Sequence, residues 1–278
     1  MDVMRRVLGL TFATTLTLGM FGLVAYTLDG SAMRQALGIA PPLDVPYVET
    51  RRAMVDTMLD MAEVEEGDHV IDLGTGDGRI LLAAAEDFGA RGIGVDLDPT
   101  LVEEARANAR RRGVSGQVTF REEDLFDTPL AEADVVTMFL LPEVNLRLRP
   151  RLLEQLRPGA RIVSNRFDMG DWRPDETRRV GGYPAYIWIV PADVSGHWVL
   201  ERDGQDIVLE LEQAFQDVSG FAMLDGERVT VTGEVRGERM RLEVGDKVPV
   251  LEGVIGGDRI RSVTGADWQA VRADDAER

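Results

Sequence analysis

Apolar residues follow four different patterns along the chain. Residues 7–28 form one uncharged, mostly apolar run, and residues 33–47 form a proline-containing stretch that we interpret as a linker. Residues 48–191 alternate short apolar segments with amphipathic ones, which is typical of strands and helices in succession. Residues 192–278 contain only short alternating segments with glycine-bearing turns between them. The chain is therefore predicted to hold an α/β domain followed by an all-β domain.

The α/β part has a regular order of elements. Apolar strands separated by helices of about 10–15 residues are typical of βαβ units, which build a mainly parallel sheet covered on both faces. A helix within residues 48–66 precedes the first strand. The predicted strands are His69–Leu73, Gly92–Leu97, Val118–Arg121, Asp134–Leu140, Arg161–Arg166 and Tyr186–Val190, and the further helices are Arg79–Phe88, Leu101–Arg112 and Glu143–Leu156.

The C-terminal part shows eight short segments with strand-like alternation. They recur at intervals of roughly 8–12 residues, which favours a small barrel or sandwich. The predicted strands are His197–Glu201, Ile207–Leu211, Gly220–Leu224, Arg228–Val235, Arg239–Val244, Val248–Val254, Arg259–Val263 and Trp268–Arg272.

The amino-terminal run predicts a membrane segment. Arg5 and Arg6 precede residues 7–28, and an apolar helix of about 20 residues spans a bilayer. Signal-peptide cores are shorter, at about 7–15 residues, and end at a small-residue cleavage site. Because Gly30-Ser31-Ala32 is a poor site of that kind, residues 1–32 are interpreted as an uncleaved anchor, with a cleaved signal as the alternative.

Composition removes several classes of function. The 278 residues include no cysteine and only two histidines, so thiolate zinc sites, disulfides and cysteine nucleophiles are excluded. His69 and His197 give little material for a metal centre or a Ser-His-Asp triad, and no metal site is predicted. The formal net charge is −18, whereas proteins that wrap nucleic acid normally present a basic surface. No nucleic-acid partner is predicted.

The most informative motif joins the first strand to the next helix. Residues 72–78 are Asp-Leu-Gly-Thr-Gly-Asp-Gly, and glycines at such a turn let a ligand approach the backbone. A nicotinamide fingerprint needs Gly-x-Gly-x-x-Gly, but its third glycine position is occupied by Arg79. The D-x-G-x-G-x-G form is that of class I S-adenosylmethionine-dependent methyltransferases, which have a Rossmann-like seven-stranded sheet.

Acidic residues close three successive strands. Asp72 ends the first strand, Asp96 the second, and Asp124 follows the third. An acid at the end of the second strand, such as Asp96, accepts hydrogen bonds from ribose hydroxyls. The resemblance to class I methyltransferases implies that Asp124 faces the adenine amino group. Carboxylates are also favourable beside the ammonium and sulfonium of S-adenosylmethionine. The predicted cofactor is therefore S-adenosyl-L-methionine, bound by Asp72, Gly74, Thr75, Gly76, Asp77, Gly78, Asp96, Leu97, Asp124, Leu125 and Phe139.

The methyl acceptor is expected beyond the fourth and fifth strands. Methyl transfer is an in-line displacement, so alignment and exclusion of water supply most of the rate enhancement. The sequence lacks Asn-Pro-Pro-Tyr after the fourth strand, which disfavours DNA-adenine and glutamine acceptors. Four residues leave these strand ends and are the predicted catalytic set: Glu143, Asn145, Asp168 and Trp172. A helix cap for Glu143 and Asn145 and a core role for Trp172 are the structural alternatives.

A family resemblance rests on motifs that occur in order. They are Tyr47-Val48-Glu49-Thr50, Asp72–Arg79, Asp96–Pro99, Asp124–Phe126, Leu140–Asn145 and Arg166–Pro174. Together they resemble the bacterial relatives of the mitochondrial ATP-synthase c-subunit lysine methyltransferase family, over about residues 45–191. The resemblance implies protein-lysine N-methylation near a membrane and adds Tyr47 and Thr50 to the cofactor site. Residues 192–278 lie outside this family pattern.

Two further hypotheses remain open. One is a small-molecule, lipid or RNA methyltransferase, and the other is a non-catalytic envelope protein that binds a ligand.

Arg5 and Arg6 favour an exported catalytic domain, but the cofactor is cytosolic. We therefore predict a single-pass protein of the bacterial inner membrane with its domains in the cytoplasm, and a periplasmic location is the alternative. The predicted partners are a protein acceptor, which could itself be membrane-embedded, and the membrane through residues 7–28, and the sequence leaves the oligomeric state open.

Overall fold

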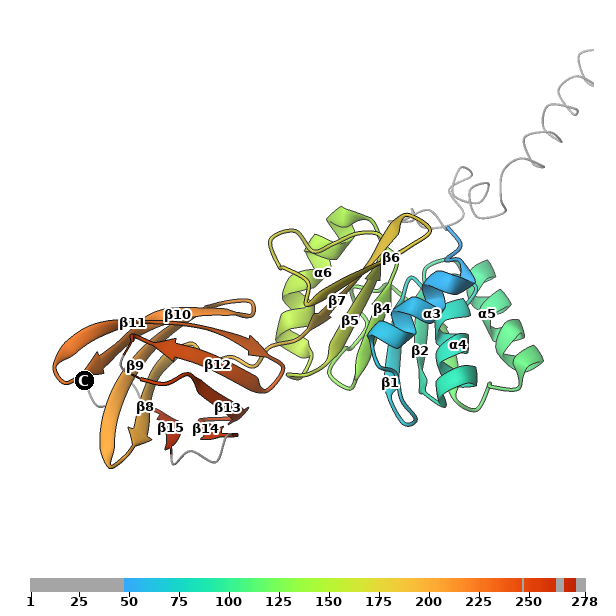
Figure 1. Cartoon of the computed structure of the whole chain (residues 1–278). Coiled ribbons are helices and arrows are strands. Elements are labelled where there is room, and N and C mark those ends of the chain that lie inside the picture. The colour runs from blue at the N-terminus through green and yellow to red at the C-terminus, as the bar shows by residue number, and fades with distance from the viewer. Residues whose placement is uncertain (1–47, 247, 264–267, 274–278) are drawn as a thin grey trace, which may run out of the picture.

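The computed structural model describes residues 48–246, 248–263 and 268–273 (Figure 1). These residues form a seven-stranded sheet with helices and a separate closed barrel. The predicted anchor (1–32), the linker (33–47) and Tyr47 lie outside the described residues. Within the described ranges, no helix has the length and apolar character needed to cross a membrane.

The seven-stranded sheet has the order β3-β2-β1-β4-β5-β7-β6. Its elements are α3 (Arg52–Met61), β1 (His69–Leu73), α4 (Arg79–Phe88), β2 (Arg91–Asp96), α5 (Pro99–Arg112), β3 (Val118–Glu122), β4 (Val135–Met138), α6 (Pro142–Gln155), β5 (Arg161–Asn165), β6 (Glu176–Val180) and β7 (Tyr183–Ile189). Strands β1 to β5 are parallel, and β7 runs antiparallel to β5. This is the α/β architecture that the sequence predicts.

Strand β6 is the one sheet element that the sequence analysis missed. Its sequence, Glu-Thr-Arg-Arg-Val, shows no apolar alternation, and none of its residues is buried. It lies at the edge of the sheet and pairs with β7 alone. An edge strand is held mainly by backbone hydrogen bonds, so its side chains carry little of the pattern that identifies buried strands.

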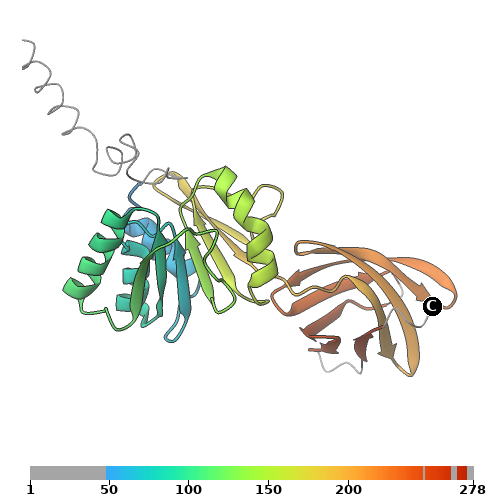
Figure 2. The ribbon, with the colours of Figure 1, turned by 180° about the vertical axis from the view of Figure 1, so that it is seen from behind.

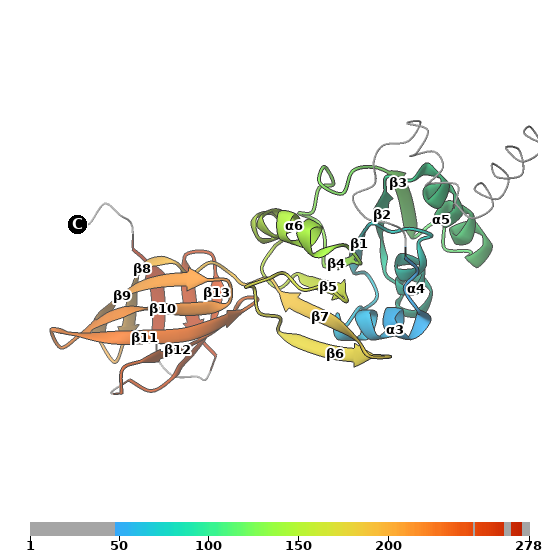
Figure 3. The ribbon, with the colours of Figure 1, turned by 90° about the horizontal axis from the view of Figure 1, so that it is seen from above.

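Alternate residues of the central strands pack on opposite faces of the sheet. Val70 and Val135 belong to a core shared with α3, α4 and α5, whereas Ile71 and Val136 belong to a core shared with α6. Figure 1 shows α3 and α4 in front of the sheet, and α6 lies in front when the molecule is seen from behind (Figure 2). The view from above shows both layers (Figure 3). Burial on both faces explains the continuous apolar runs of these strands.

The C-terminal strands close into a barrel, which decides between the barrel and the sandwich. They are β8 (Gly196–Arg202), β9 (Gln205–Ala214), β10 (Asp217–Leu224), β11 (Glu227–Arg236), β12 (Arg239–Val244), β13 (Leu251–Gly256), β14 (Arg259–Ser262) and β15 (Trp268–Arg272). Each of the eight predicted segments contributes one strand. The interior is filled by alternate side chains, including Trp198 and Trp268.

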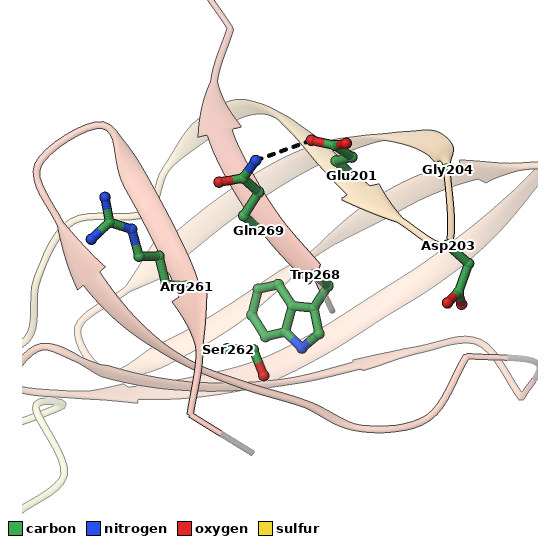
Figure 4. Close-up of a pocket in the computed structure, with 7 residues that line it drawn as sticks. All are labelled: Glu201, Asp203, Gly204, Arg261, Ser262, Trp268 and Gln269. Atoms are coloured by element: carbon green, nitrogen blue, oxygen red, sulfur yellow. Dashed lines mark hydrogen bonds between the residues drawn. The ribbon is translucent and has the colours of Figure 1, made fainter. Parts of the chain in front are cut away.

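A polar pocket of about 330 Å³ opens on the barrel (Figure 4). Glu201 and Asp203 contribute carboxylates, Arg261 contributes a guanidinium, and Gln269 donates a 3.0 Å hydrogen bond to Glu201. Trp268 as a residue is only 7% exposed and packs with the barrel core. Trp268 is therefore mainly part of the barrel core and contributes little surface to the pocket.

The barrel contacts the loop that follows β5. Phe215, in the turn between β9 and β10, stacks on Trp172 with ring centroids 5.8 Å apart. The next residue, Gln216, is buried and donates a 2.7 Å hydrogen bond to the Arg173 carbonyl. The Arg173 guanidinium in turn lies 3.2 Å from a carboxylate oxygen of Asp217. The barrel thus holds residues 172–173 through stacking, a hydrogen bond and an ion pair.

Candidate cofactor and acceptor site

The glycine loop after β1 requires residues without side chains. Gly74, Gly76 and Gly78 have φ angles of 75°, 56° and 83°, a region that favours glycine. A Cβ atom on Gly74 would lie 2.8 Å from Leu140 Cδ2, and one on Gly78 would lie 2.7 Å from the Phe120 ring. The loop can therefore pack tightly at the carboxyl end of the sheet while its backbone turns toward a ligand.

Asp72, at the end of β1, holds this loop through a hydrogen bond with Thr75. Its carboxylate is buried and accepts 2.7 Å hydrogen bonds from the hydroxyls of Thr75 and Thr137. Burial raises the pKa of Asp72 to about 6, and the neighbouring carboxylates of Asp96 and Asp77 add to this, while the two hydroxyls oppose it. A cation bound nearby would favour the charged form of this group.

Asp96 joins the end of β2 to the glycine loop. One carboxylate oxygen accepts a 2.9 Å hydrogen bond from the Gly76 amide, and the other accepts a 2.9 Å bond from the Asp98 amide. Burial raises the pKa of Asp96. The structure therefore brings Asp96 to the loop across 20 residues of sequence. Leu97, the next residue, is half-buried.

The third predicted acid lies after β3. Asp124 is half-buried, and its Oδ1 accepts a 2.8 Å hydrogen bond from the Phe126 amide. Leu125 between them is buried. This hydrogen bond holds the turn in which Asp124 follows the carboxyl end of β3. Because β1, β2 and β3 are parallel, Asp72 and Asp96 lie at the same end of the sheet.

Arg79 links the glycine loop to the amino-terminal segment, a role that the sequence analysis did not assign. Its guanidinium pairs with Asp77 at 2.6 Å and donates to the Thr50 carbonyl at 3.0 Å. A further contact reaches Glu49 at 3.3 Å. The Asn165 amide donates a 3.4 Å hydrogen bond to the Thr50 hydroxyl. Thr50, predicted from the family motif, is thus held between the loop and the end of β5.

A cavity of about 440 Å³ lies beside this link. It is bounded by the amino-terminal segment, by the ends of β4 and β5 and by the β6–β7 hairpin. Its lining residues are Val48, Glu49, Arg51, Ala53, Met54, Phe139, Asn165, Arg166, Val180, Gly181 and Tyr183. Phe139, predicted for the cofactor site, follows β4 and forms part of this wall. The sequence analysis missed Arg51, Arg166 and Tyr183, because the distant segments that carry them meet only in the folded chain.

The four residues predicted to face the acceptor have different environments. Glu143 is exposed in the first turn of α6, and Asp168 is exposed and accepts a 3.1 Å hydrogen bond from the Gly170 amide. Asn145 and Trp172 are both 0% exposed. The Asn145 amide nitrogen donates to the carbonyls of Phe167 and Asp168 at 3.2 and 3.1 Å.

These contacts show that Asn145 and Trp172 support the loop after β5, which agrees with the structural alternatives of the sequence analysis, and their part in acceptor binding stays a prediction. The physical reason is burial, because each side chain packs in support of the loop after β5 and neither lines the cavity. Glu143 and Asp168 are exposed but do not line the cavity either, so their contact with an acceptor also stays a prediction.

The site suits S-adenosylmethionine better than a phosphate-bearing cofactor. Its glycine loop leaves no room for side chains, and its carboxylates complement a cationic, hydroxyl-bearing ligand. When bound, that cofactor supplies a methyl group on a sulfonium centre. Within the described ranges, no group of three or more histidine, aspartate or glutamate side chains is arranged to hold a metal ion.

Comparison with known proteins agrees with this geometry. The profile of the ANTKMT methyltransferase domain matches residues 72–176. A protein-lysine N-methyltransferase of Saccharolobus islandicus is 40% identical over 151 residues, which are 52% of this chain and 94% of that protein. The ATP synthase c-subunit lysine N-methyltransferase of Rattus norvegicus is 35% identical, with 51% of this chain and 67% of that protein covered.

A solved structure covers the same portion of the fold. The crystal structure of an RNA methyltransferase from Salinibacter ruber, in complex with S-adenosyl-L-homocysteine, is 50% identical. It matches with a TM-score of 0.52 over 53% of this chain and 96% of that chain. Taken with the glycine loop and the strand-end acids, these matches show that the chain belongs to the ANTKMT methyltransferase family and is an S-adenosylmethionine-dependent methyltransferase.

Proposed function

We propose that this enzyme methylates the side-chain amine of lysine in a protein acceptor. The observation that carries the proposal is the cavity beside the segment that Arg79 ties to the glycine loop, whose wall includes Val48, Phe139 and Tyr183. A lysine side chain has an apolar four-carbon stem, which packs well on aliphatic and aromatic surfaces. Relatives named as protein-lysine N-methyltransferases support the same acceptor class.

The residues of this chain would orient the acceptor amine toward the methyl group and exclude water from the reaction site. The amine must lose its proton to solvent before it can attack the methyl group. The cavity wall would then hold the stem of the lysine side chain and so orient the neutral nitrogen. Such alignment is worth a large part of the barrier in a displacement reaction. Arg79 would support this step indirectly, since it fixes the Thr50 segment against the loop.

The test uses tritiated S-adenosylmethionine with separate membrane and soluble extracts of the source cells. We expect label in a protein band that is sensitive to protease and resistant to nuclease, with methyl-lysine identified by mass spectrometry. RNA is the principal alternative acceptor, because the similar Salinibacter protein is named an RNA methyltransferase. Label that disappears with ribonuclease, and none in protein, would refute the lysine proposal. The net charge of −18 weighs against RNA.

We also propose that residues 7–28 tether the enzyme to the inner membrane, with its catalytic part in the cytoplasm. The apolar run and the cytosolic origin of the cofactor support this arrangement. Reporter fusions after Arg34 and after Arg278 test it. Green fluorescence without alkaline phosphatase activity at both points is the expected result. Phosphatase activity without fluorescence would show export instead.

A further inference from the structure

Two arginines in the cavity wall have no acidic partner in the described part of the chain. Arg51 and Arg166 both line the cavity, and no ion pair joins either guanidinium to a carboxylate there. Most arginines around them are paired, for example Arg52 with Asp56 at 2.7 Å and Arg178 with Glu176 at 2.5 Å. A protein with net charge −18 thus leaves two cations unmatched at one place.

The acid in the same wall does not neutralise them. Glu49 also lines the cavity, but its carboxylate lies 3.3 Å from the Arg79 guanidinium. Arg79 also pairs with Asp77 at 2.6 Å, so both carboxylates contact this guanidinium and neither contacts Arg51 or Arg166. The remaining charge of the wall is therefore positive, and it is supplied by Arg51 and Arg166.

Arg166 is held in an unfavourable backbone conformation. Its φ angle is +73°, a region that is unfavourable for a residue with a side chain and that favours glycine. Its amide donates a 2.8 Å hydrogen bond to the Pro184 carbonyl, which fixes it at the end of β5. Glycine would fit this position at lower backbone energy, and an arginine held in this conformation points to a role for its side chain.

An aromatic ring orients the same guanidinium. The Arg166 Cζ atom lies 4.2 Å from the centroid of the Tyr183 ring. Stacking of this kind holds the planar group flat while its N–H groups stay free at the edges. Those edges match the two oxygens of a carboxylate, which accept a pair of parallel hydrogen bonds. The Arg51 NH1 atom lies 3.8 Å from the position that a Cβ on Gly181 would take, so it reaches the same β6–β7 hairpin that carries Tyr183.

We propose that Arg51 and Arg166 recognise a carboxylate on the acceptor protein, beside the lysine that is methylated. The inference rests on the proposed lysine acceptor and names its sequence context: an acidic residue adjacent to the target lysine. A phosphate would satisfy the same guanidinium pair. The acidic protein as a whole disfavours a polyanion, so a peptide carboxylate is the ligand that the observations favour.

The test compares two peptides that differ only in charge: acetyl-Gly-Glu-Lys-Glu-Gly-amide and acetyl-Gly-Gln-Lys-Gln-Gly-amide. Methyl transfer from tritiated S-adenosylmethionine gives kcat/KM for each with the full-length enzyme. Because hydrogen bonds to charged groups are stronger than neutral ones, the wild type should prefer the glutamate peptide by about 10-fold or more. The double variant R51Q/R166Q should show a preference below about 3-fold, since the charge-assisted bonds are lost.

Two further variants make the result specific. Arg166→Gly removes the side chain and the backbone strain together, so it should fold at least as well as the wild type and still lose most of the preference. Arg110→Gln removes an exposed arginine of α5, and it should keep the full preference. Calorimetric binding of S-adenosylhomocysteine shows that each variant retains its cofactor site.

The outcomes separate this inference from the proposed function. Equal kcat/KM for the two peptides in the wild type would overturn the carboxylate pair while lysine methylation stands. An unchanged preference in R51Q/R166Q would overturn it as well. Label in RNA and in neither peptide would instead refute the lysine acceptor, and the carboxylate inference with it.

Discussion

Asp96 ties the glycine loop to the end of β2 through both oxygens of its carboxylate. Its two carboxylate oxygens accept hydrogen bonds from the amides of Gly76 and Asp98, both at 2.9 Å. Asp96→Ala should weaken binding of S-adenosylmethionine by about 10- to 100-fold, because charge-assisted hydrogen bonds are worth about 1.5–3 kcal/mol. Isothermal calorimetry measures this, with the exposed Glu104→Ala as control. A dissociation constant within about 2-fold of the wild type would contradict the assignment.

Asp72 gives a prediction about pH. Burial raises its pKa from 3.8 to about 6, so the folded state holds the proton more tightly than the unfolded chain. Its contribution to stability is complete below the unfolded pKa and is lost as the pH rises through about 6. In total, roughly 3 kcal/mol of the free energy of unfolding is lost across this window.

Asp72→Asn tests this argument because the amide cannot ionise. We expect the variant to gain stability relative to the wild type as the pH rises from about 4 to about 8, by up to roughly 3 kcal/mol. Urea unfolding of the cofactor-free protein at several pH values measures the difference. Parallel pH profiles for the two proteins would show that Asp72 does not carry the buried proton.

At the scale of elements, the loop after β5 is held in place by two separate elements, helix α6 and a turn of the barrel. Asn145 of α6 holds its first part through the carbonyls of Phe167 and Asp168. The barrel turn holds its second part, since Phe215 stacks on Trp172. Arg166 at the start of this loop lines the proposed acceptor cavity. The barrel therefore helps to shape a loop that begins at the methyltransferase site.

A double-mutant cycle measures this contact. Trp172→Ala should cost about 3–5 kcal/mol of unfolding free energy, because it removes a buried indole. Phe215→Ala, in a half-buried position, should cost less. The coupling energy between the two should be about 0.5–1.5 kcal/mol, as for other aromatic pairs. Additive effects would mean that the stacked rings contribute no interaction of their own.

At the scale of the whole molecule, the two sheets have separate cores but share this junction. Besides the stacked rings, Arg236 of the barrel lies 3.1 Å from Asp175, and the Ala192 amide donates a 2.8 Å hydrogen bond to the Gly237 carbonyl. Such contacts resemble a modest interdomain interface. They are sufficient to couple the unfolding of the two parts if each part alone is only marginally stable.

Differential scanning calorimetry tests the coupling. The wild type should unfold in one transition that S-adenosylhomocysteine moves upward, by about 2.7 kcal/mol of stability at 100 times its dissociation constant. The triple variant R173A/F215A/Q216A should show two transitions, and the ligand should move only one of them. Two transitions in the wild type would show that the barrel unfolds independently of the methyltransferase fold.

The sequence alone predicted much of this protein because its information is local. The buried strands appear as apolar runs, the barrel strands as alternation, and the cofactor loop as glycines between acids at fixed spacing. Each of these signals follows from the burial or the backbone needs of a few adjacent residues. The edge strand β6 escaped detection since its side chains are not buried.

Only the tertiary structure decided how the cavity proposed for the acceptor is built. Asn145 and Trp172 were predicted as pocket residues from their place after two strands, yet both are buried in support of a loop. Arg51, Arg166 and Tyr183 come from three distant segments, and no local pattern brings them together. The physical reason is that a cofactor loop is formed by one turn of chain, whereas an acceptor cavity forms only where separate elements meet.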